Sequence, residues 1–172
     1  MAQFSQKAGA GMNGTVEPGG RQRAVADAER RGLSIDVISR PHAHGLDEAA
    51  AALGLTPGEI VKSLVVKRRD GSFLFALVPG GRRISWPKLR AVVGVNKLSM
   101  PDAAIALDAT GYPQGAITPL GSSTAWPVFA DSRVPPGRVG MGAGEVGYSA
   151  IVTGAALLES LGATIADISE PE

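Results

Sequence analysis

Residues 59–67 read EIVKSLVVK, a segment in which one lysine stands among aliphatic side chains. Side chains of a β-strand alternate between two faces, so an extended segment puts Lys62 on the face of Ile60, Leu64 and Val66. A lysine in such a position either extends its ammonium group to water at the strand end or directs it into a cavity. Inside a cavity, the ammonium group can hold a phosphate or stabilise negative charge on a carbonyl oxygen.

The surrounding sequence predicts a β-hairpin within an α+β fold. SLVVKR and SFLFALV flank RDG at residues 69–71, which is a turn signal between two apolar runs. Thr56 and Glu59 form a capping box just before the first strand of this hairpin. Glycine-terminated helices are predicted over residues 21–32, 46–54 (capped by Asp47), 86–94, 101–111 and 154–162, and further strands over 33–39, 126–131, 148–152 and 163–168. This order predicts a mixed, largely antiparallel sheet with short helices packed around it.

Length and composition predict one globular domain. The chain has 172 residues, of which 44% are hydrophobic and 19% charged. We expect a disordered tail over residues 1–20, which are rich in glycine, and a single domain over 21–172. The chain contains no cysteine, which excludes disulfides, thiolate catalysis and cysteine-ligated metal sites. No apolar run approaches the roughly 20 residues of a membrane span, and no secretory signal is visible, so we expect a cytoplasmic protein without membrane contact.

Positive charge is concentrated in one part of the chain. The segment from Lys62 to Lys97 carries nine basic residues and one acidic residue, whereas the formal net charge of the whole chain is +1. Such a segment either attracts a polyanion or is ordinary solvated surface.

Two further motifs each have more than one interpretation. GAGEVG at residues 142–147 fits G-x-G-x-x-G, but a strand-like YSAIV follows where a dinucleotide site requires a helix. Two interpretations of GAGEVG are left: a tight loop whose backbone approaches a ligand, and a plain glycine-rich turn. TGYPQGAITPLG at residues 110–121 is either a structural turn or an irregular segment that directs N–H groups at a bound carbonyl or ribose.

RPHAHG at residues 40–45 contains both histidines of the chain, His42 and His44. They either lie exposed in a polar loop or join Asp47 or Glu48 in a metal site. Without cysteine or a further histidine, we expect no metal site, no cofactor and no catalytic triad.

Taken together, EAAAALG, VKSLVVK, GYPQGAITPLG, PVFAD and GAGEVG, followed by LGATIADI, resemble the YbaK / prolyl-tRNA synthetase editing-domain family. The resemblance runs from about residue 25 to residue 169. It implies a YbaK-like fold with a barrel-like core and a free-standing, trans-acting aminoacyl-tRNA deacylase. Members of that family hydrolyse the ester of a small amino acid, such as alanine, cysteine or serine, wrongly attached to tRNA(Pro). The implied partners are aminoacyl-tRNA and prolyl-tRNA synthetase, with a monomer or a weak dimer equally open.

The resemblance also assigns residues. Lys62 matches the functionally essential lysine of the family. The implied substrate-binding residues are Ser63, Gly111, Tyr112, Gly115, Ala116, Ile117, Thr118, Pro119, Asp131, Gly142, Gly144 and Gly147. The basic segment supplies the candidates for tRNA contact, which are Lys67, Arg68, Arg69, Arg82, Arg83, Lys88, Arg90 and Lys97. Two departures stand out: Ser63 replaces the threonine of many relatives, and Glu145 and Val146 occupy a loop in which relatives often carry basic residues.

These residue types favour hydrolysis without a covalent intermediate. We expect water, or a thiol or ribose hydroxyl of the substrate, to attack the ester, while Lys62 offsets charge and the amides of residues 115–119 donate to the oxyanion. A small cavity would exclude large side chains. A non-catalytic tRNA- or protein-binding module of the same fold is the alternative.

Overall fold

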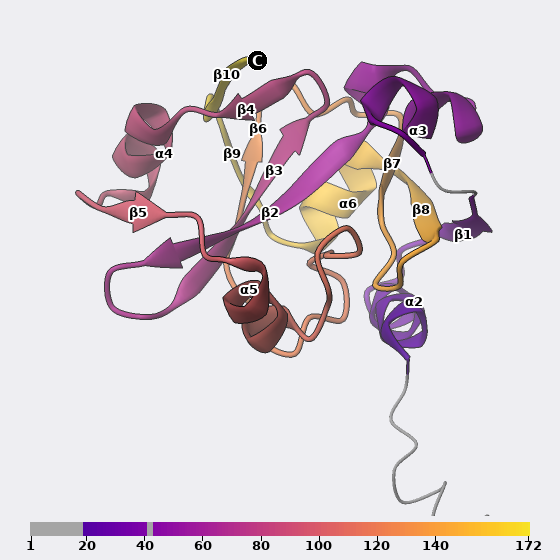
Figure 1. The fold of residues 1–172 in the computed structure, drawn as a ribbon, viewed down its shortest axis with the longest axis horizontal. Helices are drawn as coiled ribbons and strands as arrows, with labels where there is room; N and C mark the ends of the chain where they lie inside the picture. Colours follow the sequence, from indigo (N-terminus) through magenta and orange to yellow (C-terminus); the bar gives the residue numbers. More distant parts are fainter. Residues whose placement is uncertain (1–18, 41–42) are drawn as a thin grey trace, which may run out of the picture.

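The structure is a computed structural model that describes residues 19–40 and 43–172. Residues 1–18 of the predicted tail, and His42 of the histidine motif, lie outside the described residues. The first described helix, α2, spans Gly20–Arg30, one residue earlier than predicted (Figure 1). Among the described helices, none is long and apolar enough to cross a membrane.

The central element is a five-stranded sheet with the strand order β5-β2-β3-β6-β9 (Figure 1). Its first three strands are antiparallel, and β6 and β9 extend it in parallel. The predicted hairpin is confirmed, since Lys67 of β2 pairs with Phe73 of β3 across the turn at residues 69–72. The strands are β5 (Leu98–Ser99), β2 (Val61–Arg68), β3 (Phe73–Pro79), β6 (Val128–Asp131) and β9 (Thr164–Ala166).

Two smaller antiparallel sheets flank the central one. One has the order β1-β8-β7, formed by Asp36–Ser39, Tyr148–Thr153 and Arg138–Gly142, and a parallel bridge between Ile60 and Gly140 joins it to the start of β2. The other pairs β4 (Arg82–Ile84) with β10 (Ser169–Pro171). The predicted α+β architecture is confirmed, although the described strands form three sheets rather than a closed barrel.

Short helices connect the strands at the expected places: α3 (Leu46–Ala52), the 3-10 turn η1 (Pro57–Glu59), α4 (Trp86–Val93), α5 (Ala103–Thr110) and α6 (Gly154–Ser160). Gly94 and Gly111 end α4 and α5 in the left-handed conformation, with φ of 82° and 80°, because that conformation strains any residue with a Cβ. The prediction that Asp47 caps α3 is wrong. Gly45 takes the cap position, and Asp47 lies in the first turn, where its charge still favours the helix dipole.

The two faces of the central sheet cover two separate cores. Val61 and Val65 point into a core shared with α2, α6 and the β1-β8-β7 sheet. Leu64 and Val66 point to the other side, toward Leu89 of α4. The alternation predicted for residues 60–66 therefore holds, and Lys62 lies at the end of the second face.

Candidate functional site

A cavity of about 370 Å³ runs along the edge of β2 that carries no neighbouring strand. β5 pairs only with Lys67 and Arg68, so the part of β2 from residue 61 to residue 65 faces this cavity instead. Because the cavity follows a strand edge, residues from both faces of β2 reach it. Its volume lies within the range of about 300–1,000 Å³ that is usual for small-molecule sites.

Ser63 brings a buried hydroxyl group to the cavity wall. Its Oγ atom is inaccessible to solvent and has no hydrogen-bond partner among the described residues. Buried polar atoms in folded proteins are nearly always hydrogen-bonded, since an unpaired one costs roughly 1–3 kcal/mol. A polar group of a bound ligand could supply the hydrogen-bond partner that this hydroxyl lacks.

Lys62 borders the same cavity, but its ammonium group is engaged at the edge. Nζ donates to the carbonyl oxygen of Arg82 and lies 3.1 Å from a carboxylate oxygen of Glu172. The side chain is 28% exposed, so the ammonium group is neither in bulk water nor fully buried. Lys62 thus stands between the cavity and the C-terminal strand β10.

The predicted loop at residues 110–121 forms the opposite wall, where Gly115 and Ile117 line the cavity. Tyr112 is buried behind them, and its hydroxyl donates to the carbonyl oxygen of Leu120 at 2.7 Å. Burial raises the pKa of that hydroxyl above its ordinary value. Thr118 is also buried, and its hydroxyl accepts a hydrogen bond from the Leu120 N–H. Internal hydrogen bonds therefore hold the irregular path of this loop.

Helix α2 clamps the loop from outside. The Arg23 guanidinium lies 4.6 Å from the centre of the Tyr112 ring and donates to the carbonyl oxygens of Gly111 and Gly121. Asp27, one helical turn further, accepts the Gly121 N–H at 2.8 Å. Burial alone would raise the pKa of Asp27, but this N–H and the neighbouring arginines lower it overall. Neither Arg23 nor Asp27 was predicted from the sequence, although their i,i+4 spacing beside buried Ala24 and Ala28 places them on one helix face.

The glycine-rich loop packs against the same structure. Gly142 lines the cavity, and a Cβ there would lie 2.4 Å from the carbonyl oxygen of Ile117. Gly144 has φ of 86°, its N–H donates to the Ala116 carbonyl, and a Cβ would lie 2.5 Å from the carbonyl oxygen of Gly20. Gly147 has φ of 91° but open space around it. Gly142 and Gly144 therefore have to be glycine because neighbouring backbone leaves no space for a Cβ, whereas Gly147 has that space.

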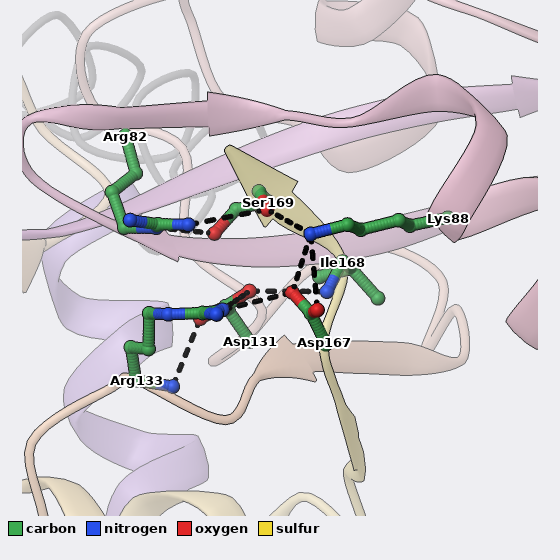
Figure 2. Close-up of polar contacts among 7 residues, drawn as sticks. All are labelled: Arg82, Lys88, Asp131, Arg133, Asp167, Ile168 and Ser169. Atoms are coloured by element: carbon green, nitrogen blue, oxygen red, sulfur yellow. Dashed lines mark hydrogen bonds and ion pairs between the residues drawn. The ribbon is translucent and has the colours of Figure 1, made fainter. Parts of the chain in front are cut away.

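Asp131 lies away from the cavity that Lys62 borders. It is buried at the end of β6, where it accepts hydrogen bonds from the N–H groups of Arg133 and Ile168 at 2.9 and 3.1 Å (Figure 2). Burial alone would raise the pKa of Asp131, and the hydrogen bonds from Ser169, Arg133 and Ile168 lower it overall. These contacts connect β6 to the C-terminal segment.

The other predicted residues divide between the cavity wall and its support. The structure brings Lys62, Ser63, Gly115, Ile117 and Gly142 together around the cavity. The remaining predicted substrate-binding residues do not line it: Gly111, Tyr112, Ala116, Thr118, Pro119, Asp131, Gly144 and Gly147.

Several cavity residues were absent from the sequence prediction. Arg40 lines the wall with its Nε donating to the hydroxyl of Ser149 at 2.7 Å, and Gln114 lines it from the loop. Met100 and Leu53 add apolar surface. Gln114 stands inside the quoted loop and could have been named, whereas the others reach the cavity only through the tertiary fold.

No group of three or more His, Asp or Glu side chains could hold a metal ion within residues 19–40 and 43–172. The fold and the cavity define an α+β protein with a candidate ligand site, which combines an ammonium group, a buried hydroxyl and a glycine-rich backbone wall.

Comparisons with known proteins identify the family. Residues 40–160 match the model of the aminoacyl-tRNA editing domain, so the chain belongs to this family, as the resemblance predicted. The protein is 37% identical over 89 residues to the proline–tRNA ligase of Thermosipho africanus strain TCF52B, covering 52% of this chain and 16% of that one. Against the proline–tRNA ligase of Thermoanaerobacter sp. strain X514 it is 32% identical over 119 residues, covering 67% and 21%. The chain thus spans about a fifth or less of these relatives' length.

A solved structure resembles the chain over nearly all of both lengths. It belongs to a protein described as a proposed trans-editing enzyme for prolyl tRNA synthetase, and it matches with a TM-score of 0.81 and 29% identity. The match covers 90% of this chain and 99% of that one, which supports a role in aminoacyl-tRNA editing.

Proposed function

We propose that the protein is a trans-acting deacylase that hydrolyses the ester between a small amino acid and tRNA(Pro), with alanine, cysteine and serine as the candidate amino acids. The observation that carries this proposal is the cavity whose lining combines Lys62 and the unpartnered hydroxyl of Ser63 with Gly115 and Ile117 of the loop. The editing-domain family and the proline–tRNA ligase relatives support the substrate class.

The site favours attack by water or by a group of the substrate. The chain has no cysteine, and none of the described residues that line the cavity is a histidine that could act as a base for Ser63. Water adds to the acyl carbon, the bond to the ribose oxygen breaks, and a proton ends on that oxygen. The products are the free amino acid and tRNA with an intact terminal ribose.

Charge stabilisation is the main task of the protein groups. Lys62 exchanges the Glu172 carboxylate for a substrate phosphate or for the negative oxygen that develops in the transition state. The N–H of Ala116 already donates to the Pro113 carbonyl at 3.0 Å, so the oxyanion donors of the loop are the amides of Gly115 and Ile117, which line the cavity. Holding the ester against these groups adds the benefit of fixed orientation.

Selectivity follows from the apolar wall. Leu53, Met100 and Ile117 restrict the space available to the amino-acid side chain. Such a wall excludes large side chains but discriminates near-isosteres by only about 10–200-fold.

The test is a panel of tRNAs charged with alanine, cysteine, serine or proline and incubated with the purified protein. We expect release of at least one of the three small amino acids from tRNA(Pro), with prolyl-tRNA(Pro) left intact. Binding of the panel without release of any amino acid would reject the deacylase and identify a non-catalytic module.

A further inference from the structure

Another hollow lies where β2 ends, beside β5. It measures about 150 Å³, and every residue lining it is basic except one serine. Its residues are Lys67, Arg68, Arg69, Lys97 and Ser99.

The pairing of β2 with β5 brings these groups together. Lys67 pairs with Ser99 and Arg68 with Leu98. Arg69 follows β2 and Lys97 precedes β5, so Lys67, Arg69, Lys97 and Ser99 border one hollow and form the basic face of the β2–β5 pair. Like charges held this close repel one another, and a bound anion would remove that cost.

The charges of this face are not neutralised within the protein. None of its three cations forms an ion pair or a side-chain hydrogen bond with any of the described residues. The nearby carboxylate of Asp70 instead accepts hydrogen bonds from the N–H and the hydroxyl of Ser72, at 2.9 and 2.6 Å.

The other predicted tRNA contacts have a different environment. Arg83 and Lys88 pair with Glu170 and Asp167 at 3.4 and 3.0 Å. The Arg82 guanidinium donates to the hydroxyl of Ser169, as Figure 2 shows. The C-terminal segment thus occupies these three cations. Arg68 and Arg90, like the cations of the basic face, form no ion pair with any of the described residues.

The basic face adjoins the cavity along two elements. Ser99 of the hollow precedes Met100 and Pro101, which line the cavity. Along β2, four residues separate Ser63 in the cavity from Lys67, a distance of roughly 13 Å at about 3.3 Å per residue. That distance corresponds to roughly four stacked nucleotides at about 3.4 Å each.

We propose that the face formed by Lys67, Arg69, Lys97 and Ser99 binds backbone phosphates of the RNA whose aminoacylated end occupies the cavity. This inference rests on the proposed function, because the cavity must hold that end. The phosphates it contacts lie a few nucleotides from the ester, whereas Arg82, Arg83 and Lys88 serve the fold.

The test compares two double variants that lose the same charge. Arg69→Gln with Lys97→Gln removes two cations of the basic face, and Arg30→Gln with Arg83→Gln removes two exposed cations that are each paired with a carboxylate. The affinity of each protein for tRNA(Pro) without an attached amino acid is measured over a salt series. We expect the first variant to reduce the slope of log K against log[salt] by about two, while the control keeps the wild-type slope. The inference would be overturned by equal slopes in all three proteins or by an equal reduction of the slope in both variants. It would also be overturned if the wild type did not bind tRNA.

A deacylation assay separates this inference from the proposed function. At saturating mischarged tRNA, the basic-face variant should keep the wild-type kcat and show only a raised KM. An aminoacyl ester of a dinucleotide, too short to reach the face, should be hydrolysed equally by both proteins. A lower turnover of the dinucleotide ester by the variant would place these residues in the chemistry and contradict the proposal. If the wild type releases no amino acid, the deacylase is rejected, and the salt series still decides whether the face binds RNA.

Discussion

The ammonium group of Lys62 donates hydrogen bonds both to the Glu172 carboxylate and to the carbonyl oxygen of Arg82. The Glu172 side chain is 55% exposed, and exposed ion pairs contribute only about 0–1 kcal/mol. A substrate anion can therefore displace this carboxylate. The contact lowers the fraction of protein whose lysine is free to bind substrate.

Replacing Glu172 should consequently increase activity. For Glu172→Gln we expect kcat/KM to rise by up to about fivefold, the factor that corresponds to 1 kcal/mol, with little change in thermal stability. Glu170→Gln removes the same charge from the carboxylate that pairs with Arg83 and should leave kcat/KM unchanged. A decrease for Glu172→Gln would mean that the carboxylate positions Lys62 for catalysis.

Ser63 allows binding to be separated from stability. Because its hydroxyl lacks a partner in the described structure, Ser63→Ala should leave the free energy of unfolding unchanged or raise it. The same variant should raise KM by about 2- to 13-fold, as one net hydrogen bond contributes about 0.5–1.5 kcal/mol. Ser63→Thr keeps the hydroxyl and serves as the control. An unchanged KM in Ser63→Ala, measured beside denaturant unfolding, would exclude this contact with substrate.

Helix α2 holds the cavity loop although it lies outside the residues that match the family model. Arg23→Ala removes two hydrogen bonds and a cation–π contact to the loop. We expect a loss of about 1–3 kcal/mol in unfolding free energy, faster hydrogen exchange in residues 111–121, and a lower kcat/KM. Glu29→Ala, at an exposed position of the same helix, is the control. Normal exchange in the loop of Arg23→Ala would show that the clamp is dispensable.

Local signals explain which elements could be predicted from the sequence. The hairpin was predictable because alternation and turn residues are close neighbours in the chain, and α5 because Asp102 and Gly111 cap it with their own atoms. Strand β7 was missed, because its glycines at 140 and 142 are typical of a loop. In the fold, Leu53 and the Ile117 carbonyl oxygen lie where side chains at these two positions would be, so the strand carries glycine there.

Candidate residues were predictable to the extent that they belong to one segment. Lys62, Ser63, Gly115 and Ile117 came from two quoted motifs and do line the cavity. Asp131 illustrates the opposite case, since the resemblance to the editing-domain family assigned it to substrate binding. Its partners are N–H groups of the chain, and one of them, Ile168, is 37 residues away. No pattern in the sequence carries that information.

The carboxylates of Asp131 and Asp167 connect β6, α4 and the C-terminal strands (Figure 2). Hydrogen bonds from Arg133 and then Lys88 lower the pKa of Asp167 from 3.8 to about 2. A carboxyl group with a lowered folded-state pKa stabilises the fold above its unfolded pKa, and this contribution is lost as the pH falls through the folded pKa.

We therefore expect the thermal unfolding midpoint to fall as the pH decreases from about 4 toward 2. Asp167→Asn should start from a lower midpoint at pH 7 and lose less of it over the same interval, because it has no proton to take up. Parallel curves for the two proteins would show that Asp167 contributes nothing to the acid sensitivity. Thermal melts by circular dichroism across a pH series provide the measurement.

The proposed chemistry depends on the positive charge of Lys62 at the cavity edge. Single-turnover release of labelled amino acid from mischarged tRNA(Pro), measured for the wild type and for Lys62→Ala, examines that dependence. We predict that Lys62→Ala keeps its circular dichroism spectrum but releases amino acid at least about 100-fold more slowly, the usual cost of losing one group that stabilises an oxyanion. A folded Lys62→Ala protein that releases amino acid at a near-wild-type rate would contradict the mechanism.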